Sequence, residues 1–268
     1  MPSISAATRQ IIGVCPPARG VVVTELIQSA NAPVNLILCP DLKIAEQIAE
    51  DVALFHHESS TGSVELDIVV LPQSMATDAD MREAFAASAD RTTVLSKLRA
   101  TRAHTKAHRK APLLVVVSFP GAVVQSVPAL EKFAENEFEI KPGSSISYKS
   151  LLEKLHALDY DSEALCEAPG QYAIRGGLID VYPVTANEPY RLDYFGDELE
   201  EIRAFDPVNQ RSGVSVTAIT LSASPRLKLD AAGSGLSDYL SAGTALVMIE
   251  PTGIETAMSS LAEQSEKS

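Results

Sequence analysis

Three continuous apolar runs constrain the fold of this chain more than any other feature. They are VNLILC (34–39), LDIVVL (66–71) and LLVVV (113–117). A strand that reads as apolar at every position is typical of a parallel sheet covered on both faces. None approaches the ~20 residues of a membrane span. The runs therefore predict buried parallel strands.

Helical patterns separate these runs. After Asp41, a candidate helix N-cap, the apolar residues Ile44, Ile48, Val52 and Phe55 recur at helical spacing. Strands that alternate with helices predict an α/β layer with a parallel sheet.

The second half of the chain has a different pattern. An amphipathic helix is expected over 148–158, and further strands over 214–221 and 245–249, before a frayed tail at 259–268. Four strand-like segments follow the helix in quick succession: 171–175, 178–182, 191–195 and 201–205. Their short connections, Gly176-Gly177 among them, predict an antiparallel meander in an α+β unit.

Composition narrows the function classes. With 268 residues, 46% of them hydrophobic and 21% charged, the chain is expected to fold into about two globular domains. A net charge of −13 disfavours nucleic-acid binding over a broad surface. The three cysteines (Cys15, Cys39 and Cys166) form no C-x-x-C pair, and no signal peptide is recognised. A reducing, cytoplasmic location is expected.

A basic stretch stands out against this acidity. Residues 91–110 contain no acid and seven cations: Arg91, Lys97, Arg99, Arg102, Lys106, Arg109 and Lys110. The stretch is either a phosphate-binding helix or, as we favour, a solvated one. His104 and His108 are spaced i, i+4, but no Glu accompanies them and their neighbours are cationic, so no metal site is expected.

A phosphate-binding loop would lie between a short strand expected at 10–14 and a helix expected at 21–30. The sequence there is GVCPPARG. Set against G-x-x-x-x-G-K-[ST], Gly13 matches, but Ala18, Arg19 and Gly20 replace the second Gly, the Lys and the Ser/Thr.

The chemistry of this loop argues against nucleotide binding. Such loops hold phosphates with successive backbone N–H groups, and Pro16 and Pro17 have none. Gly20 has no hydroxyl for Mg²⁺, and Arg19 replaces a compact ammonium with a fork. We therefore expect a degenerate loop, no cofactor and no catalytic residue.

Two stretches resemble a known family. They are residues 33–55 and 171–212, the latter including RGGLIDVYP and YRLDYFGDE. Together they resemble the N-terminal UvrB-homology module of bacterial transcription-repair coupling factor (Mfd), which is itself similar to the repair helicase subunit UvrB. UvrB proteins keep an intact phosphate-binding loop and a Tyr-rich hairpin after the strand that ends near Leu71. This chain has neither, which favours the coupling factor.

The resemblance implies an architecture of three parts. Domain 1a, a degenerate P-loop-type α/β domain, would cover 1–118. Domain 2, an inserted α+β meander, would cover 136–222. Domain 1b would combine 119–135 with 223–268.

The resemblance also implies a function. The chain would be a non-catalytic interaction module that recruits UvrA to stalled transcription complexes in nucleotide excision repair. RNA polymerase and DNA would bind domains of the longer family protein that these residues do not include. The alternatives are a UvrB-like DNA-dependent ATPase and a DNA-binding accessory domain that uses the basic stretch.

The residues that contact UvrA in the family correspond to Arg175, Arg191 and Phe195. Strand alternation places Arg191, Asp193 and Phe195 on one face, with Leu192 and Tyr194 on the other. We expect Arg191 and Phe195 to project together into solvent, where replacing them would hardly change stability. Tyr172 and Ile174 would point to the opposite face, which leaves Arg175 exposed. Acidic residues of the next turn would steer a basic partner: Asp197, Glu198, Glu200 and Glu201.

Overall fold

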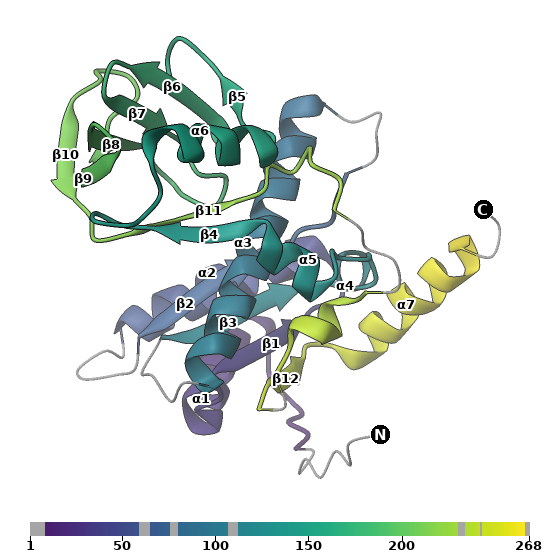
Figure 1. The fold of residues 1–268 in the computed structure, drawn as a ribbon. Helices are drawn as coiled ribbons and strands as arrows, with labels where there is room; N and C mark the ends of the chain where they lie inside the picture. The colour runs from purple at the N-terminus through teal and green to yellow at the C-terminus, as the bar shows by residue number, and fades with distance from the viewer. Residues whose placement is uncertain are drawn as a thin grey trace.

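A four-stranded parallel sheet forms the lower body of the molecule (Figure 1). The computed structural model describes residues 9–58, 65–75, 80–106, 112–229, 234–241 and 243–265. The sheet has the order β12-β1-β3-β2. Its strands are β1 (Val34–Leu38), β2 (Leu66–Val70), β3 (Leu113–Ser118) and β12 (Ala245–Met248). All pairings are parallel, so the prediction from the apolar runs is confirmed.

Helices cover both faces of this sheet, which explains why its central strands lack polar alternation. One face packs against α1 (Arg19–Ala30) and α2 (Leu42–Glu58). The other face packs against α3, α5 and their neighbours. These are α3 (Met81–Lys106), α4 (Pro120–Val123), α5 (Leu130–Glu135) and the 3₁₀ helix η2 (Leu236–Tyr239). Among the described residues, no helix combines the length and apolarity needed to cross a bilayer.

Helix α2 forms as the sequence predicts. The backbone N–H of Ile44 donates to Oδ1 of Asp41 at 2.9 Å, which caps the first turn. Ile48 and Val52 are buried against the sheet, on the stripe that helical spacing predicts.

A second body sits above the parallel sheet and is built around an antiparallel meander (Figure 1). Its six-stranded sheet has the order β10-β9-β8-β7-β6-β5 and packs against α6 (Tyr148–Ala157). The strands are β5 (Asp161–Ser162), β6 (Gln171–Arg175), β7 (Leu178–Val181), β8 (Tyr190–Phe195), β9 (Glu198–Phe205) and β10 (Ser212–Ser215). A two-stranded ribbon of β4 (Glu137–Ile140) and β11 (Ile219–Ser222) leads into and out of this body. The predicted α/β class, with parallel and antiparallel sheets, is confirmed.

Tight turns fix the register of the meander. Arg175 pairs with Leu178 across Gly176-Gly177, and Gly176 has the positive φ of +61° that such turns require. A Cβ on Gly177 would lie 2.8 Å from the carbonyl oxygen of Tyr194, so only glycine fits there. The two-residue hairpin predicted from the sequence is confirmed.

Three local expectations are wrong. Residues 10–14 form no strand and join neither edge of the parallel sheet; Gly13, with a φ of +77°, interrupts the extended backbone that a strand needs. The strand expected at 214–221 is two strands, since β10 pairs with β9 and β11 pairs with β4. Residues 259–265 of the tail expected to fray belong to helix α7 (Pro251–Ser265), which contacts α4 and buries Ile254. The last three residues lie outside the described part of the chain.

Candidate partner-binding face

The loop that resembles a phosphate-binding sequence is closed by contacts within the chain. A short 3₁₀ turn, η1 (Pro16–Ala18), leads directly into α1, which begins at Arg19. The guanidinium of Arg19 forms an ion pair with the carboxylate of Glu250, which follows β12. The positive charge that a phosphate would need is therefore already compensated.

Gly20 has a packing role in this loop. A Cβ at Gly20 would lie 2.4 Å from Cβ of Asp51 and 3.1 Å from the ring of Phe55. Glycine therefore permits α1 to pack closely on α2, which explains the residue type without a ligand. Gly13, at the other end of the loop, has a φ of +77° and open space around it.

The first part of the basic stretch lies on α3, and the four cations whose side chains the structure describes contact other parts of the fold. The partners are the carbonyl oxygens of Pro72 and Ala122 for Arg91, Asp67 for Lys97, Glu137 for Arg99, and the carbonyl oxygen of Asp238 for Arg102. Arg91 is buried, so the solvated interpretation is wrong for that residue, whereas Lys97 and Arg99 keep about a third of their side chains exposed. The phosphate-binding interpretation of the stretch stays a prediction.

The remaining part of that stretch cannot be compared in the same way. Arg109, Lys110 and His108 lie outside the described residues, so the i, i+4 histidine pair is not complete in the structure. Within the described residues, no group of three or more His, Cys, Asp or Glu side chains could hold a metal ion.

The six-stranded sheet has two chemically distinct faces. One packs on α6, where Leu192 and Tyr194 are buried and the Tyr194 ring meets that of Tyr148 edge-on at 5.5 Å. Tyr172 is also buried on this side, while Ile174 lies near the end of its strand and is 47% exposed. The predicted inward orientation of Leu192 and Tyr194 is therefore confirmed.

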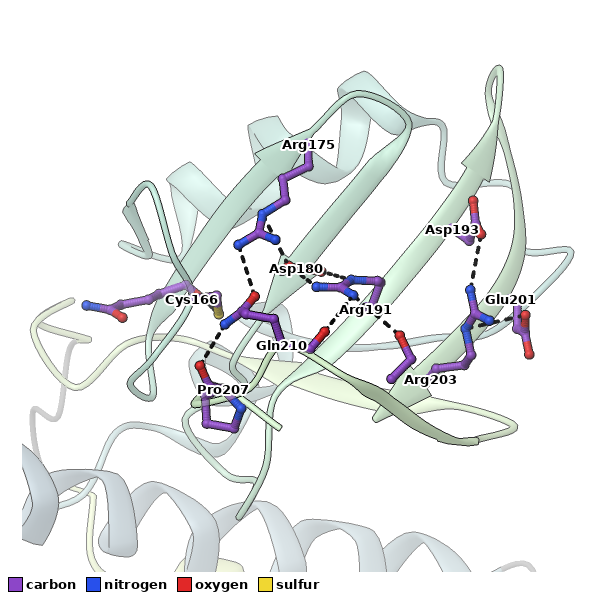
Figure 2. Close-up of polar contacts among 11 residues, drawn as sticks. Cys166, Arg175, Asp180, Arg191, Asp193, Glu201, Arg203, Pro207 and Gln210 are labelled. Atoms are coloured by element: carbon purple, nitrogen blue, oxygen red, sulfur yellow. Dashed lines mark hydrogen bonds and ion pairs between the residues drawn. The ribbon is translucent and has the colours of Figure 1, made fainter. Parts of the chain in front are cut away.

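The opposite face carries the residues that resemblance to the family singled out. We call it the arginine face and define it by the cross-strand pairs that share it: Ala173, Arg175, Leu178, Asp180, Arg191, Asp193, Phe195, Glu198, Glu201, Arg203 and Phe205. Figure 2 shows its arginines reaching across neighbouring strands toward acidic and amide side chains.

Arg191 does not project into solvent, and that expectation is wrong. Its side chain is 11% exposed, and it donates to both carboxylate oxygens of the fully buried Asp180, at 2.7 and 2.8 Å. The guanidinium also lies over the ring of Phe205, 4.8 Å from its centroid. Hydrogen bonding to the Asp180 carboxylate raises the pKa of Arg191. The pair is a structural element of the face.

Arg175 lies at the border between this buried pair and solvent. Its side chain is 35% exposed, and its Nε is 3.8 Å from Oδ2 of Asp180. One terminal nitrogen donates to Oε1 of Gln210 at 2.9 Å. Arg175 is therefore held in place while part of its guanidinium stays accessible.

Phe195 is the most exposed aromatic residue of the face. It is 77% exposed at the last position of β8, directly opposite Glu198 on β9. At about 3.3 Å per residue, it lies roughly 13 Å along the strand from Arg191. Phe195 and Arg191 thus share a face but do not form one contact point. Arg175 lies two strands away from Phe195, level with Asp193 of β8 through Leu178 of β7.

Sequence reasoning missed Asp180 and Gln210, which organise this face. The two-residue turn at Gly176-Gly177 is enough to place Asp180 opposite Ala173. Its pairing with Arg191 depends on the register between β7 and β8, whose connection is too long for turn chemistry to fix. Gln210 lies in a loop, where no periodic signal exists.

The hairpin end of the arginine face, around Phe195, is acidic, and we call it the open end. Asp193 and Glu201 flank Arg203, whose guanidinium contacts both, at 3.4 and 3.5 Å. Asp197, Glu198 and Glu200 are exposed around the turn beside Phe195. A large apolar side chain is thus displayed within a ring of negative charge.

Comparison with known proteins places this sheet in a defined family. Residues 138–226 match the UvrB interaction domain, a range that begins within β4 and extends past β11. A transcription-repair-coupling factor from Bacillus subtilis is 26% identical over 211 residues, which are 79% of this chain and 16% of the relative. UvrABC system protein B from Fusobacterium nucleatum is 28% identical over 198 residues, 72% of this chain and 28% of the relative.

A third relative has a higher sequence identity over a shorter stretch. A transcription-repair-coupling factor from Escherichia coli is 38% identical over 82 residues, which are 31% of this chain and 7% of the relative. The resemblance to the UvrB-homology module is therefore confirmed. The chain spans between 7% and 28% of the length of these three relatives.

Proposed function

We propose that this chain is a non-catalytic protein-interaction module that recruits UvrA in nucleotide excision repair, through the open end of its arginine face. The observation that carries the proposal is the display of Phe195, 77% exposed, on the same face of the sheet as the partly exposed Arg175, within the stretch that matches the UvrB interaction domain. Aromatic and arginine side chains dominate the binding energy of protein interfaces. A buried aromatic would serve the fold, but this one contributes little to any core.

Arg191 has a different part in this proposal. Because its guanidinium is committed to Asp180, it supports the face and keeps the carboxylate neutralised beneath Arg175. We assign the direct contacts to Arg175 and Phe195, and the support to Arg191.

The proposed absence of catalysis rests on the loop around Arg19. The Arg19–Glu250 ion pair removes the free charge, Gly20 packs against Asp51, and Pro16 supplies no backbone donor. An ATPase of the UvrB kind would need a free positive charge, a hydroxyl for Mg²⁺ at the position of Gly20, and backbone N–H donors along this loop. The proposal therefore includes no cofactor for these residues.

We further propose three structural parts: 1–118, 136–222, and 119–135 with 223–268. The six-stranded sheet supports the second, because its core has its own set of buried residues. The third part supplies β12 to the sheet of the first, so these two would form one rigid base.

Contacts with RNA polymerase and DNA belong, in this proposal, to other parts of a longer protein. Four cations of α3 (Arg91, Lys97, Arg99 and Arg102) are engaged within the fold, so the chain itself would bind nucleic acid weakly. A module with this role would act in the cytoplasm.

Binding to purified UvrA tests the proposal. Phe195→Ala should leave the free energy of unfolding within about 0.5 kcal/mol of wild type. Arg175→Ala also removes the contact with Asp180 and the hydrogen bond to Gln210, and it should cost about 1 kcal/mol. At least one should weaken UvrA binding by about 2 kcal/mol, or roughly 30-fold, as an interface anchor does. Calorimetric titration of the full chain measures the loss.

Matched controls come from exposed residues away from the arginine face. Leu54→Ala on α2 removes a side chain that is 55% exposed, and Lys149→Ala on α6 removes a charge that is 85% exposed. Both should bind UvrA as wild type does. Wild-type affinity in both Arg175→Ala and Phe195→Ala would overturn the proposal.

A further inference from the structure

The loop after β9, residues 206–211, is held together by several hydrogen bonds of its own. Oδ1 of Asp206 accepts from the backbone N–H groups of Val208 at 2.8 Å and Asn209 at 3.4 Å. Oδ2 of Asp206 accepts from the Asn209 side chain at 2.6 Å. The backbone N–H of Gln210 donates to the Asp206 carbonyl at 2.8 Å, and the Asp206 N–H donates to the Arg211 carbonyl at 3.0 Å. The loop is a preformed structure.

Gln210 attaches this loop to the arginine face (Figure 2). Its Oε1 accepts from Arg175 at 2.9 Å, and its backbone carbonyl accepts from Arg191 at 3.3 Å. Its side-chain nitrogen donates to the Pro207 carbonyl at 2.7 Å. The same residue therefore contacts both arginines and the neighbour of the loop tip.

The backbone of Gln210 has a φ of +61°, a conformation that few residues other than glycine and asparagine adopt readily. A glycine there would keep the chain path at lower cost. The backbone therefore does not require glutamine at this position. The glutamine side chain links Arg175 to the loop.

The tip of the loop presents Val208, which is 90% exposed. An apolar side chain in this position adds almost nothing to burial, so the fold does not account for it. A rigid loop loses little conformational entropy when it binds, which makes it an effective contact element. Val208 directly follows Pro207 and lies two residues before Gln210, so the tip is linked to Arg175 through the hydrogen bonds of Gln210.

We infer that the loop 206–211 is a second contact element for the same UvrA partner, with Val208 as an apolar contact and Gln210 as a positioning residue that acts through Arg175. The inference rests on the proposed function. The interface continues from Arg175 to the loop through the shared contact with Gln210. The matching surface of UvrA would offer an apolar depression for Val208 beside a hydrogen-bond acceptor for Arg175.

Val208→Asp tests the contact. Because the side chain packs against little, unfolding in urea should be unchanged, while affinity for purified UvrA should fall at least about tenfold. Val208→Leu should retain binding. The control is Val124→Asp, at an exposed position at the end of α4 in the lower body, which should bind as wild type does.

Gln210→Gly tests the positioning role, because glycine keeps the positive φ and removes only the side chain. It should weaken UvrA binding about three- to tenfold, the size of one hydrogen bond. In an Arg175→Ala background the same change should cost clearly less, because the group that Gln210 positions is gone. A merely structural role would give equal losses in both backgrounds.

The outcomes separate this inference from the proposed function. If Val208→Asp binds as wild type does while Arg175→Ala or Phe195→Ala binds weakly, the loop is not a contact, and the proposed function stands. If Gln210→Gly and Arg175→Ala combine additively, the positioning role is wrong. If neither Arg175→Ala nor Phe195→Ala weakens binding, the proposed function itself fails.

Discussion

Helix α3 and the arginine face both concentrate positive charge, and they use it in opposite ways. On α3, Lys97 pairs with Asp67 and Arg99 with Glu137, so the charges serve to join elements of the fold. On the arginine face, Arg191 pairs with the buried carboxylate of Asp180, while the side chain of Arg175 stays 35% exposed. Acidic residues from distant parts of the chain decide which cation remains available to a partner.

This contrast also explains why one strand contributes two kinds of residue. Along β8, Arg191 is turned into a layer formed by Asp180 and Phe205, whereas Phe195 lies beyond that layer at the hairpin end. The same face is therefore structural at one end and open at the other.

The largest expected effect is at the structural end of the face. Arg191→Ala would leave the fully buried carboxylate of Asp180 without its bidentate partner. Such a loss typically costs about 3–5 kcal/mol. Urea unfolding should show it, whereas Arg203→Ala, which breaks ion pairs that are a third or more exposed, should cost at most about 1 kcal/mol. Equal stabilities for the two variants would contradict the division of the face.

The ion pairs of α3 provide a second, smaller contrast. The Glu137 side chain is 1% exposed and accepts from Arg99 and from Ser222. Arg99→Ala would leave this buried carboxylate without its counter-charge and should cost about 3 kcal/mol. Asp67 is 38% exposed, and Asp67→Ala should cost at most about 1 kcal/mol. Thermal unfolding of both variants measures the difference. A larger loss for Asp67→Ala would mean that burial does not set the strength of these links.

Two buried thiols, one in each body of the molecule, should make the protein less stable at alkaline pH. Burial raises the pKa of Cys39 in the parallel-sheet body and of Cys166 in the meander body to about 12, from an ordinary value of 9.0. Both thiols stay neutral in the fold while the unfolded chain ionises. Their contribution is therefore complete below pH 9 and is lost as the pH rises toward 12.

Unfolding in urea at pH 8 and pH 10 tests this. The Cys39→Ala and Cys166→Ala variants should each lose less stability between these two pH values than wild type does. Cys15 is exposed, so Cys15→Ala should follow wild type. An unchanged pH dependence in both buried-thiol variants would exclude the thiols as its cause.

The smallest expected effect is no change at all, at the loop around Arg19. Excess Mg-ATP should leave the midpoint of thermal unfolding unchanged, because the Arg19 guanidinium is already paired with the Glu250 carboxylate. Nucleotide at 100 times its dissociation constant would stabilise by about 2.7 kcal/mol, which a melt resolves. Duplex DNA near physiological salt should likewise have no effect, and a clear shift with either ligand would favour the UvrB-like alternative.

Sequence alone predicted the parts of this molecule that local chemistry determines. The apolar runs gave the parallel strands, Gly176-Gly177 gave the hairpin, and alternation along β8 gave the buried side of Leu192 and Tyr194. Each of these depends on neighbouring residues in the sequence. The open position of Phe195 follows from the same alternation.

What sequence reasoning could not supply was competition between distant segments. Residues 10–14 have strand-like character, but all four strands of the parallel sheet come from segments that lie later in the chain. Arg191 has the alternation of an outward residue, yet Asp180 arrives beside it through the register of β7 and β8. Residue type and spacing contain neither fact.

The central claim is that UvrA binds the open end of the arginine face, and hydrogen exchange of the chain with and without UvrA tests it most directly. The account predicts slower amide exchange on binding around Gly176 and Phe195 and in the loop 206–211. Exchange around Arg19 and along α3 should stay unchanged. Protection confined to the Arg19 loop or to α3, with none at the arginine face, would contradict the account.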